Sequence, residues 1–126
     1  MKKIAVVLLL LIGTSCEMCR EMRSLGVNEF SRYLKRRNVV LIDVRTPEEY
    51  AEGHIPGTDF NINVLDDSFE REILDRISPD SHVAIYCRSG NRSKTAGAVL
   101  VNNCYKVVEL ESGFKGWKEA GKKIEH

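Results

Sequence analysis

The sequence lacks the features that mark membrane-spanning, nucleic-acid-binding and disulfide-rich proteins. Its longest apolar run, residues 4–12, has nine residues, whereas a transmembrane helix needs about 20. Lys and Arg number 19 against 18 for Asp and Glu, so there is no basic excess to indicate a nucleic acid partner. Four cysteines in 126 residues do not indicate a disulfide framework, and the chain is long enough to bury a core without one. These absences, with 43% hydrophobic and 29% charged residues, indicate an ordinary globular domain.

The first 15 residues have the pattern of an export signal. Met1 is followed by two lysines, then by the apolar run, and residues 13–15 (Gly-Thr-Ser) supply small side chains at a cleavage point. A buried core helix is the alternative for the apolar run, but the basic start and the small residues after it favour a signal peptide over residues 1–15. The sequence therefore predicts export to the bacterial cell envelope.

Cys16 and Cys19 follow this segment in an expected linker over residues 16–25. Cys16 resembles the lipidated cysteine of a bacterial lipoprotein, although Gly13 stands where such sites usually have Leu. The same stretch also suits an ordinary signal peptidase, so the exported chain would be periplasmic or anchored to the membrane through Cys16. No second cysteine pair accompanies Cys16 and Cys19, so no metal site is predicted.

From residue 26 to residue 126, short apolar runs alternate with helical patterns. Strands are expected at residues 39–42, 82–86 and 107–110. Helices are expected at residues 27–36, 67–77, 93–102 and around Trp117, and a short helix opens at residues 46–49, with Thr46 as its cap and Glu49 at its third position. This alternation predicts one α/β domain with a central parallel sheet and helices on both faces. In such sheets ligands bind at the carboxyl ends of the strands. Cys104, at the end of an apolar run, is expected to be a small buried residue.

One of these strand ends carries a pattern suited to anion chemistry. The strand that ends at Tyr86 runs into a short polar loop and then a helix, and the loop reads Cys87-Arg88-Ser89-Gly90-Asn91-Arg92. If the loop curls around Cys87, its backbone N–H groups and the helix N-terminus form an anion-binding concavity that favours a thiolate. Gly90 is free to adopt positive φ, and Arg88 and Arg92 suit oxyanions. Cys87 is the predicted nucleophile, and Arg88, Ser89, Gly90, Asn91 and Arg92 are the predicted anion-binding residues.

Residues 87–93 resemble the active-site loop of rhodanese-like sulfurtransferases. Residues 41–57 resemble the N-terminal signature of that family and residues 110–121 its closing motif, although Ser112 stands where many members have Gly. The resemblance spans roughly residues 26–125. It implies a thiosulfate sulfurtransferase that moves a sulfane sulfur from thiosulfate or a related donor to cyanide or a thiol. The intermediate would be a persulfide on Cys87, and no metal or organic cofactor is implied.

The other strand end of interest carries Asp43 and Arg45. The resemblance implies that they form ion pairs that support the active loop, with Arg45 also able to contact the donor and Asp43 mainly structural. His54 belongs to a connector in this family, so the resemblance implies a structural role rather than a general base.

Two alternatives share these residues. Protein tyrosine phosphatases also hold a cysteine in a cradle of N–H groups, but their pattern has one more residue between the cysteine and the arginine. Four residues separate Cys87 from Arg92, and the shorter loop favours a sulfane sulfur over a phosphoryl group. The second alternative is an exported persulfide or thiol-redox carrier, or a binding module, with little turnover. Binding modules of the family typically lose the cysteine, and an assay with several acceptors separates a carrier from an enzyme.

Overall fold

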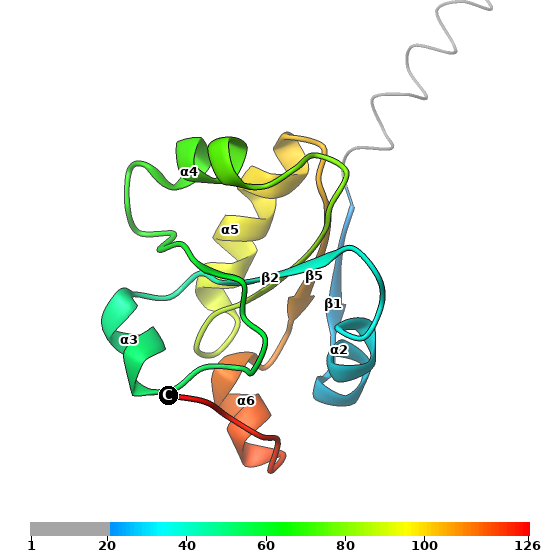
Figure 1. Ribbon diagram of the computed structural model, residues 1–126, viewed down its shortest axis with the longest axis vertical. Helices are drawn as coiled ribbons and strands as arrows, with labels where there is room; N and C mark the ends of the chain where they lie inside the picture. Colours follow the sequence, from blue (N-terminus) through cyan, green and yellow to red (C-terminus); the bar gives the residue numbers. More distant parts are fainter. Residues whose placement is uncertain (1–20) are drawn as a thin grey trace, which may run out of the picture.

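A five-stranded, fully parallel sheet runs through the centre of the computed structural model, which describes residues 21–126 (Figure 1). The strand order is β1-β5-β4-β2-β3. The strands are β1 (Met22–Leu25), β2 (Val39–Asp43), β3 (Phe60–Asn61), β4 (His82–Tyr86) and β5 (Lys106–Leu110). The predicted α/β fold is confirmed. The predictions for residues 1–15, Cys16 and Cys19 lie outside the described residues.

Helices cover both faces of this sheet. They are α2 (Val27–Tyr33), α3 (Pro47–Glu52), α4 (Phe69–Arg76), α5 (Asn91–Asn102) and α6 (Gly113–Glu119). One apolar cluster packs residues of α4 and α5 against the sheet, and a second packs residues of α2 and α6 against it. Successive residues of β4 alternate between the clusters, with Val83 and Ile85 in the first and Ala84 and Tyr86 in the second. A strand buried on both faces needs the continuous apolar run seen in the sequence.

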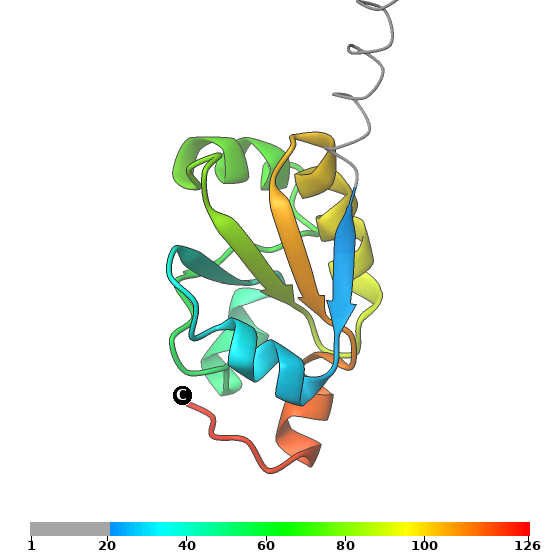
Figure 2. The same ribbon diagram turned by 90° about the vertical axis from the view of Figure 1, so that its right-hand side faces the viewer.

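The carboxyl ends of the strands converge at one edge of the sheet. The arrowheads of β4, β5 and β1 all point toward α6 (Figure 2). Asp43, the last residue of β2, pairs in register with Tyr86, the last residue of β4. The segments that begin at Val44 and Cys87 therefore leave the sheet side by side, and both predicted site segments reach the same edge.

Apart from shifts of one to three residues in the bounds of elements, the structure differs from the sequence predictions in three places. Residues 22–25, expected to belong to a linker, form β1 and pair with β5. Only Leu25 of this strand is buried, so the strand has no apolar run to reveal it. The two-residue strand β3 is too short to leave a pattern. Cys104 is exposed rather than buried, because it lies in the turn after α5 with a φ of 62°. None of the helices in residues 21–126 is long and apolar enough to cross a membrane.

Candidate active site

Cys87 lies directly after β4, where the sheet gives way to the loop that leads into α5. Its side chain is buried, with 1% of the residue exposed. The backbone N–H of Gly90 donates a hydrogen bond to Cys87 Sγ at 3.1 Å. Gly90 precedes the first turn of α5 and has a φ of 100°, a left-handed conformation that glycine adopts without steric cost. The N–H group and the nearby helix start both favour negative charge on the sulfur. The structure thus brings Cys87 and Gly90 together as predicted.

The beginning of α6 holds the same loop from the other side. Phe114 N–H donates to the carbonyl oxygen of Cys87 at 2.8 Å, and Lys115 N–H donates to that of Arg88 at 2.9 Å. Gly113 allows this approach, because a Cβ atom there would lie 2.4 Å from the Arg88 carbonyl oxygen. Sequence reasoning found the motif that contains Gly113 but did not predict that it holds the loop.

Gly90 provides a test of the loop geometry. A Cβ atom at Gly90 would lie 2.2 Å from the carbonyl oxygen of Glu111, a contact that the backbone must move to relieve. Because small displacements of a reacting group are costly, Gly90→Ala is expected to slow the sulfur transfer that the sequence predicts on the order of 100-fold. The measurement is the rate of product formation by the folded variant, with folding checked by circular dichroism.

Gly57→Ala is the matched control for this prediction. Gly57 also has positive φ, 83°, but a Cβ atom there meets nothing within 4 Å. The control therefore costs about 1 kcal/mol of backbone strain and leaves the transfer rate unchanged. If Gly90→Ala transferred sulfur as fast as Gly57→Ala, the loop geometry would not be required for the reaction.

Asp43 and Arg45 form a buried ion pair next to this loop. Arg45 Nη2 lies 2.6 Å from Asp43 Oδ2, and the two side chains are 4% and 0% exposed. The same nitrogen donates to the carbonyl oxygen of Gly53 at 2.8 Å. Burial alone would lower the pKa of Arg45, but the hydrogen bonds and the charge of Asp43 raise it above its ordinary value. Arg45 is thus a fixed cation that links β2 to the connector after α3.

A second ion pair joins α5 to α3. Arg92 donates through Nη1 and Nη2 to the two carboxylate oxygens of Glu49, at 2.6 and 2.8 Å. The Arg92 guanidinium lowers the pKa of Glu49 to about 2. Glu49 also completes a capping box with Thr46, the predicted cap residue of this helix. The guanidinium of Arg92 is therefore paired with Glu49, a contact that sequence reasoning did not foresee, and its role in binding the donor stays a prediction.

A buried carboxylate beneath the loop was also missed. Glu109, the next-to-last residue of β5, is 0% exposed and accepts hydrogen bonds from Ser24 and from Ser93, the latter at 2.6 Å. Lys94 Nζ lies 2.6 Å from Glu109 and also donates to the Gly90 carbonyl oxygen at 3.4 Å. Burial would raise the pKa of Glu109, but these three partners hold it below its ordinary value. The signal available in the sequence was a single carboxylate within the apolar run of residues 107–110.

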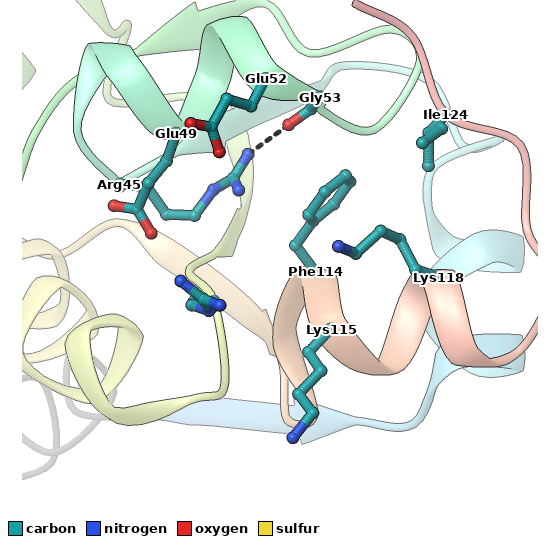
Figure 3. Close-up of a pocket in the computed structure, with 9 residues that line it drawn as sticks. Arg45, Glu49, Glu52, Gly53, Phe114, Lys115, Lys118 and Ile124 are labelled. Carbon is teal, nitrogen blue, oxygen red and sulfur yellow. Dashed lines mark hydrogen bonds between the residues drawn. The ribbon is translucent and has the colours of Figure 1, made fainter.

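A cavity of about 350 Å³ opens beside the loop (Figure 3). Arg88 contributes to its wall, and the Arg88 side chain forms no ion pair within residues 21–126. Ser89 and Asn91 are exposed at the surface of the loop. Arg45 and Glu49 also line the cavity, so both ion pairs described above border it. Arg88 and Arg45 therefore line the cavity, Asp43 and Arg92 are held next to it by their ion pairs, and Cys87 and Gly90 lie in the adjoining loop.

His54 lies in the connector that follows α3. His54 stacks on Tyr50 with ring centroids 3.9 Å apart, and its Nδ1 lies 2.9 Å from the Tyr50 carbonyl oxygen. These contacts place His54 in the packing of the connector. Within the described part of the chain, no group of His, Cys, Asp and Glu side chains is arranged to hold a metal ion.

Comparison with known proteins identifies the architecture. A family model described as "Rhodanese-like domain" matches residues 26–120. The chain belongs to the rhodanese-like family. This confirms the resemblance read from the loop and the two flanking motifs.

The names of individual relatives of this rhodanese-like protein agree with the family assignment. The thiosulfate sulfurtransferase GlpE of Pseudoalteromonas translucida is 29% identical over 101 residues, which cover 78% of this chain and 90% of the relative. A sulfurtransferase of Allochromatium vinosum is 35% identical over 97 residues, covering 71% and 81%. The crystal structure of a rhodanese-related protein from Thermoplasma volcanium superposes with a TM-score of 0.71 at 29% identity, covering 82% and 97%. These matches support sulfur transfer as the general class of activity of this rhodanese-like protein.

Proposed function

We propose that this protein transfers a sulfane sulfur from thiosulfate to a thiophilic acceptor through a persulfide on Cys87. The observation that carries the proposal is the hydrogen bond from Gly90 N–H to the buried Cys87 Sγ at the start of α5. A backbone donor held in this position stabilises a charged sulfur without cost of reorganisation during the reaction. The sulfurtransferase relatives named above support the same chemistry.

The reaction proceeds in two displacements at sulfur. The Cys87 thiolate attacks the outer sulfur of thiosulfate, a bond forms between the two sulfurs, and sulfite leaves with the electron pair of the broken S–S bond. The acceptor then attacks the outer sulfur of the persulfide, and the electron pair of that S–S bond returns to Cys87 Sγ as thiolate. Covalent catalysis of this kind predicts ping-pong kinetics, and the two steps together need no added oxidant or reductant.

The residues around Cys87 have separate roles in this scheme. Gly90 N–H offsets the negative charge of the thiolate and of the persulfide. Arg88, at the wall of the cavity, attracts the anionic donor. The outer sulfur lies about 2 Å beyond Sγ, so the persulfide lengthens a side chain that is almost completely buried. The two ion pairs keep the segments that carry these groups in place.

The experiment is to incubate the reduced full chain with thiosulfate, remove the excess and measure the intact mass. The expected result is a gain of one sulfur atom, which cyanide then removes as thiocyanate in equal amount. Cys87 must first be shown to be reduced by its reaction with an alkylating reagent. A reduced, alkylatable Cys87 that gains no sulfur from thiosulfate would reject this donor.

A sulfur carrier and a sulfurtransferase enzyme differ in whether repeated rounds of the second displacement, to cyanide, follow the first. We propose turnover rather than single loading, so thiocyanate is expected to accumulate in many-fold excess over the protein. Release of no more than one equivalent would instead assign the protein a carrier role.

A further inference from the structure

The cavity beside the loop is larger than thiosulfate and cyanide, the small inorganic donor and acceptor ions, require. Its volume of about 350 Å³ falls at the lower end of the range for sites that hold small organic molecules. Arg88, the neighbour of Cys87, is part of its wall, so the cavity begins at the reactive loop. Its other lining residues come from α3 and the segments on either side of it, and from α6 and the segment that follows it.

The charges of this cavity are unequally distributed. Arg45 and Glu49 are neutralised by Asp43 and Arg92. The remaining charged lining residues form no ion pair with any of residues 21–126, and they are the cations Arg88, Lys115 and Lys118 and the carboxylate of Glu52. Three positive charges and one negative charge leave a formal excess of +2.

The α6 wall carries the positive charge of the cavity next to an apolar surface. Lys118 extends toward the ring of Phe114, with Nζ 5.1 Å from the ring centroid, whereas Lys115 extends away from the ring (Figure 3). Glu52 lies on the opposite, α3 wall (Figure 3). Ile124 adds further apolar surface. A ligand with a carboxylate would be drawn to the Lys118 side and kept from the Glu52 side.

We propose that this cavity binds the sulfur acceptor, and that the acceptor is a small organic thiol that carries a carboxylate. This inference rests on the proposed function, because it concerns the second displacement. The acceptor thiol loses its proton to water, and its thiolate attacks the outer sulfur of the Cys87 persulfide. The new S–S bond belongs to the acceptor, and the electron pair of the broken bond stays on Cys87 Sγ. Both reactants are anions, so the cations Arg88 and Lys118 reduce their repulsion.

The test compares two thiols that differ only in the charge far from the sulfur. The full chain is loaded with sulfur from thiosulfate, desalted and mixed with 3-mercaptopropionate or with its neutral amide, 3-mercaptopropionamide. The loss of sulfur from the protein is followed by intact mass, and rates are compared at equal thiolate concentration. The carboxylate is expected to react about fivefold faster at low salt, and the advantage is expected to disappear near about 1 M salt.

Three lysine variants locate the effect. Lys118→Gln keeps most of the side-chain length but removes the charge, and it is expected to reduce the preference for the carboxylate at least about twofold. Lys115→Gln, at a lysine that extends away from the ring, is expected to have a smaller effect. Lys106→Gln, at the opposite end of β5, is the matched control and should leave the preference unchanged. Equal rates for the two thiols at low salt, or equal effects of all three variants, would overturn the proposal.

A binding measurement keeps this inference separate from the persulfide mechanism. The Cys87→Ser protein is titrated with 3-mercaptopropionate, and backbone amide signals are followed by NMR. Shifts centred on Gly53, Phe114 and Lys118, and weaker shifts with the neutral amide, are expected. Failure to load sulfur would reject the donor or the persulfide alone, whereas the absence of shifts at these residues would reject the acceptor site alone.

Discussion

Cys87→Ser is expected to abolish persulfide formation and to lower sulfur transfer at least about 1,000-fold. A serine hydroxyl is hardly ionised near neutral pH, and its oxygen is a poor nucleophile toward sulfane sulfur, whereas thiolate is the reactive form of cysteine. Serine is close in size to cysteine, and Gly90 N–H retains an acceptor at this position. The variant should therefore fold, which circular dichroism and thermal unfolding check, while its intact mass stays unchanged after thiosulfate.

Cys104→Ser is the matched control for this loss. The full chain has four cysteines, so a mass gain in the wild-type chain does not by itself identify the sulfur that carries it. Cys104 is exposed in the turn after α5, away from the loop, and its replacement should leave loading and turnover at wild-type level. A Cys87→Ser protein that still gained one sulfur removable by cyanide would contradict the assignment of the nucleophile.

Asp43→Ala is expected to destabilise the domain by about 3–5 kcal/mol. The substitution leaves the Arg45 guanidinium buried without the carboxylate that accepts hydrogen bonds from its Nε, its Nη2 and its backbone N–H. A loss of this size is a large fraction of the roughly 5–15 kcal/mol by which domains of this kind are stable. Urea unfolding followed by circular dichroism measures the free energy of unfolding, and the unfolding midpoint should fall strongly.

An exposed ion pair provides the comparison for this prediction. Arg76 and Glu72 lie one turn apart on α4 at 3.4 Å, with side chains 43% and 35% exposed. Glu72→Ala removes the same kind of charge, but water solvates the remaining arginine, so the change should stay within about 0.5 kcal/mol. If Asp43→Ala cost no more than Glu72→Ala, burial of the Arg45 charge would not be the source of the stability.

The fold could be predicted wherever burial leaves a pattern in the chain. Strands β2 and β4 are buried on both faces and therefore appear as continuous apolar runs, and the capping box of α3 is local to residues 46–49. Strand β1 could not be found in this way, because its pairing with β5 depends on backbone hydrogen bonds and only one of its side chains is buried.

In the candidate site, too, the local features could be predicted and the distant contacts could not. The order of Cys87, Gly90 and the start of α5 is local, so the hydrogen bond from Gly90 N–H to Cys87 Sγ could be predicted from spacing and backbone chemistry. The contacts that hold it are distant in sequence. Glu49 binds Arg92 from 43 residues away, and Ser24 binds Glu109 from 85 residues away. Nothing in the spacing of such residues says that they meet, because the sheet order brings them together.

The hydrogen bonds from α6 to the loop can form only after α6 itself has been synthesised. Cys87 leaves the ribosome before residues 106–115, which form β5 and the start of α6. A chain that ends before residue 106 has the proposed nucleophile, Cys87, but lacks the strand that lies between β1 and β4. It also lacks the backbone donors of Phe114 and Lys115 that hold the loop carbonyls. Residues 106–115 therefore complete a site whose proposed nucleophile was made well before them, so partial chains hold the thiol without its finished surroundings.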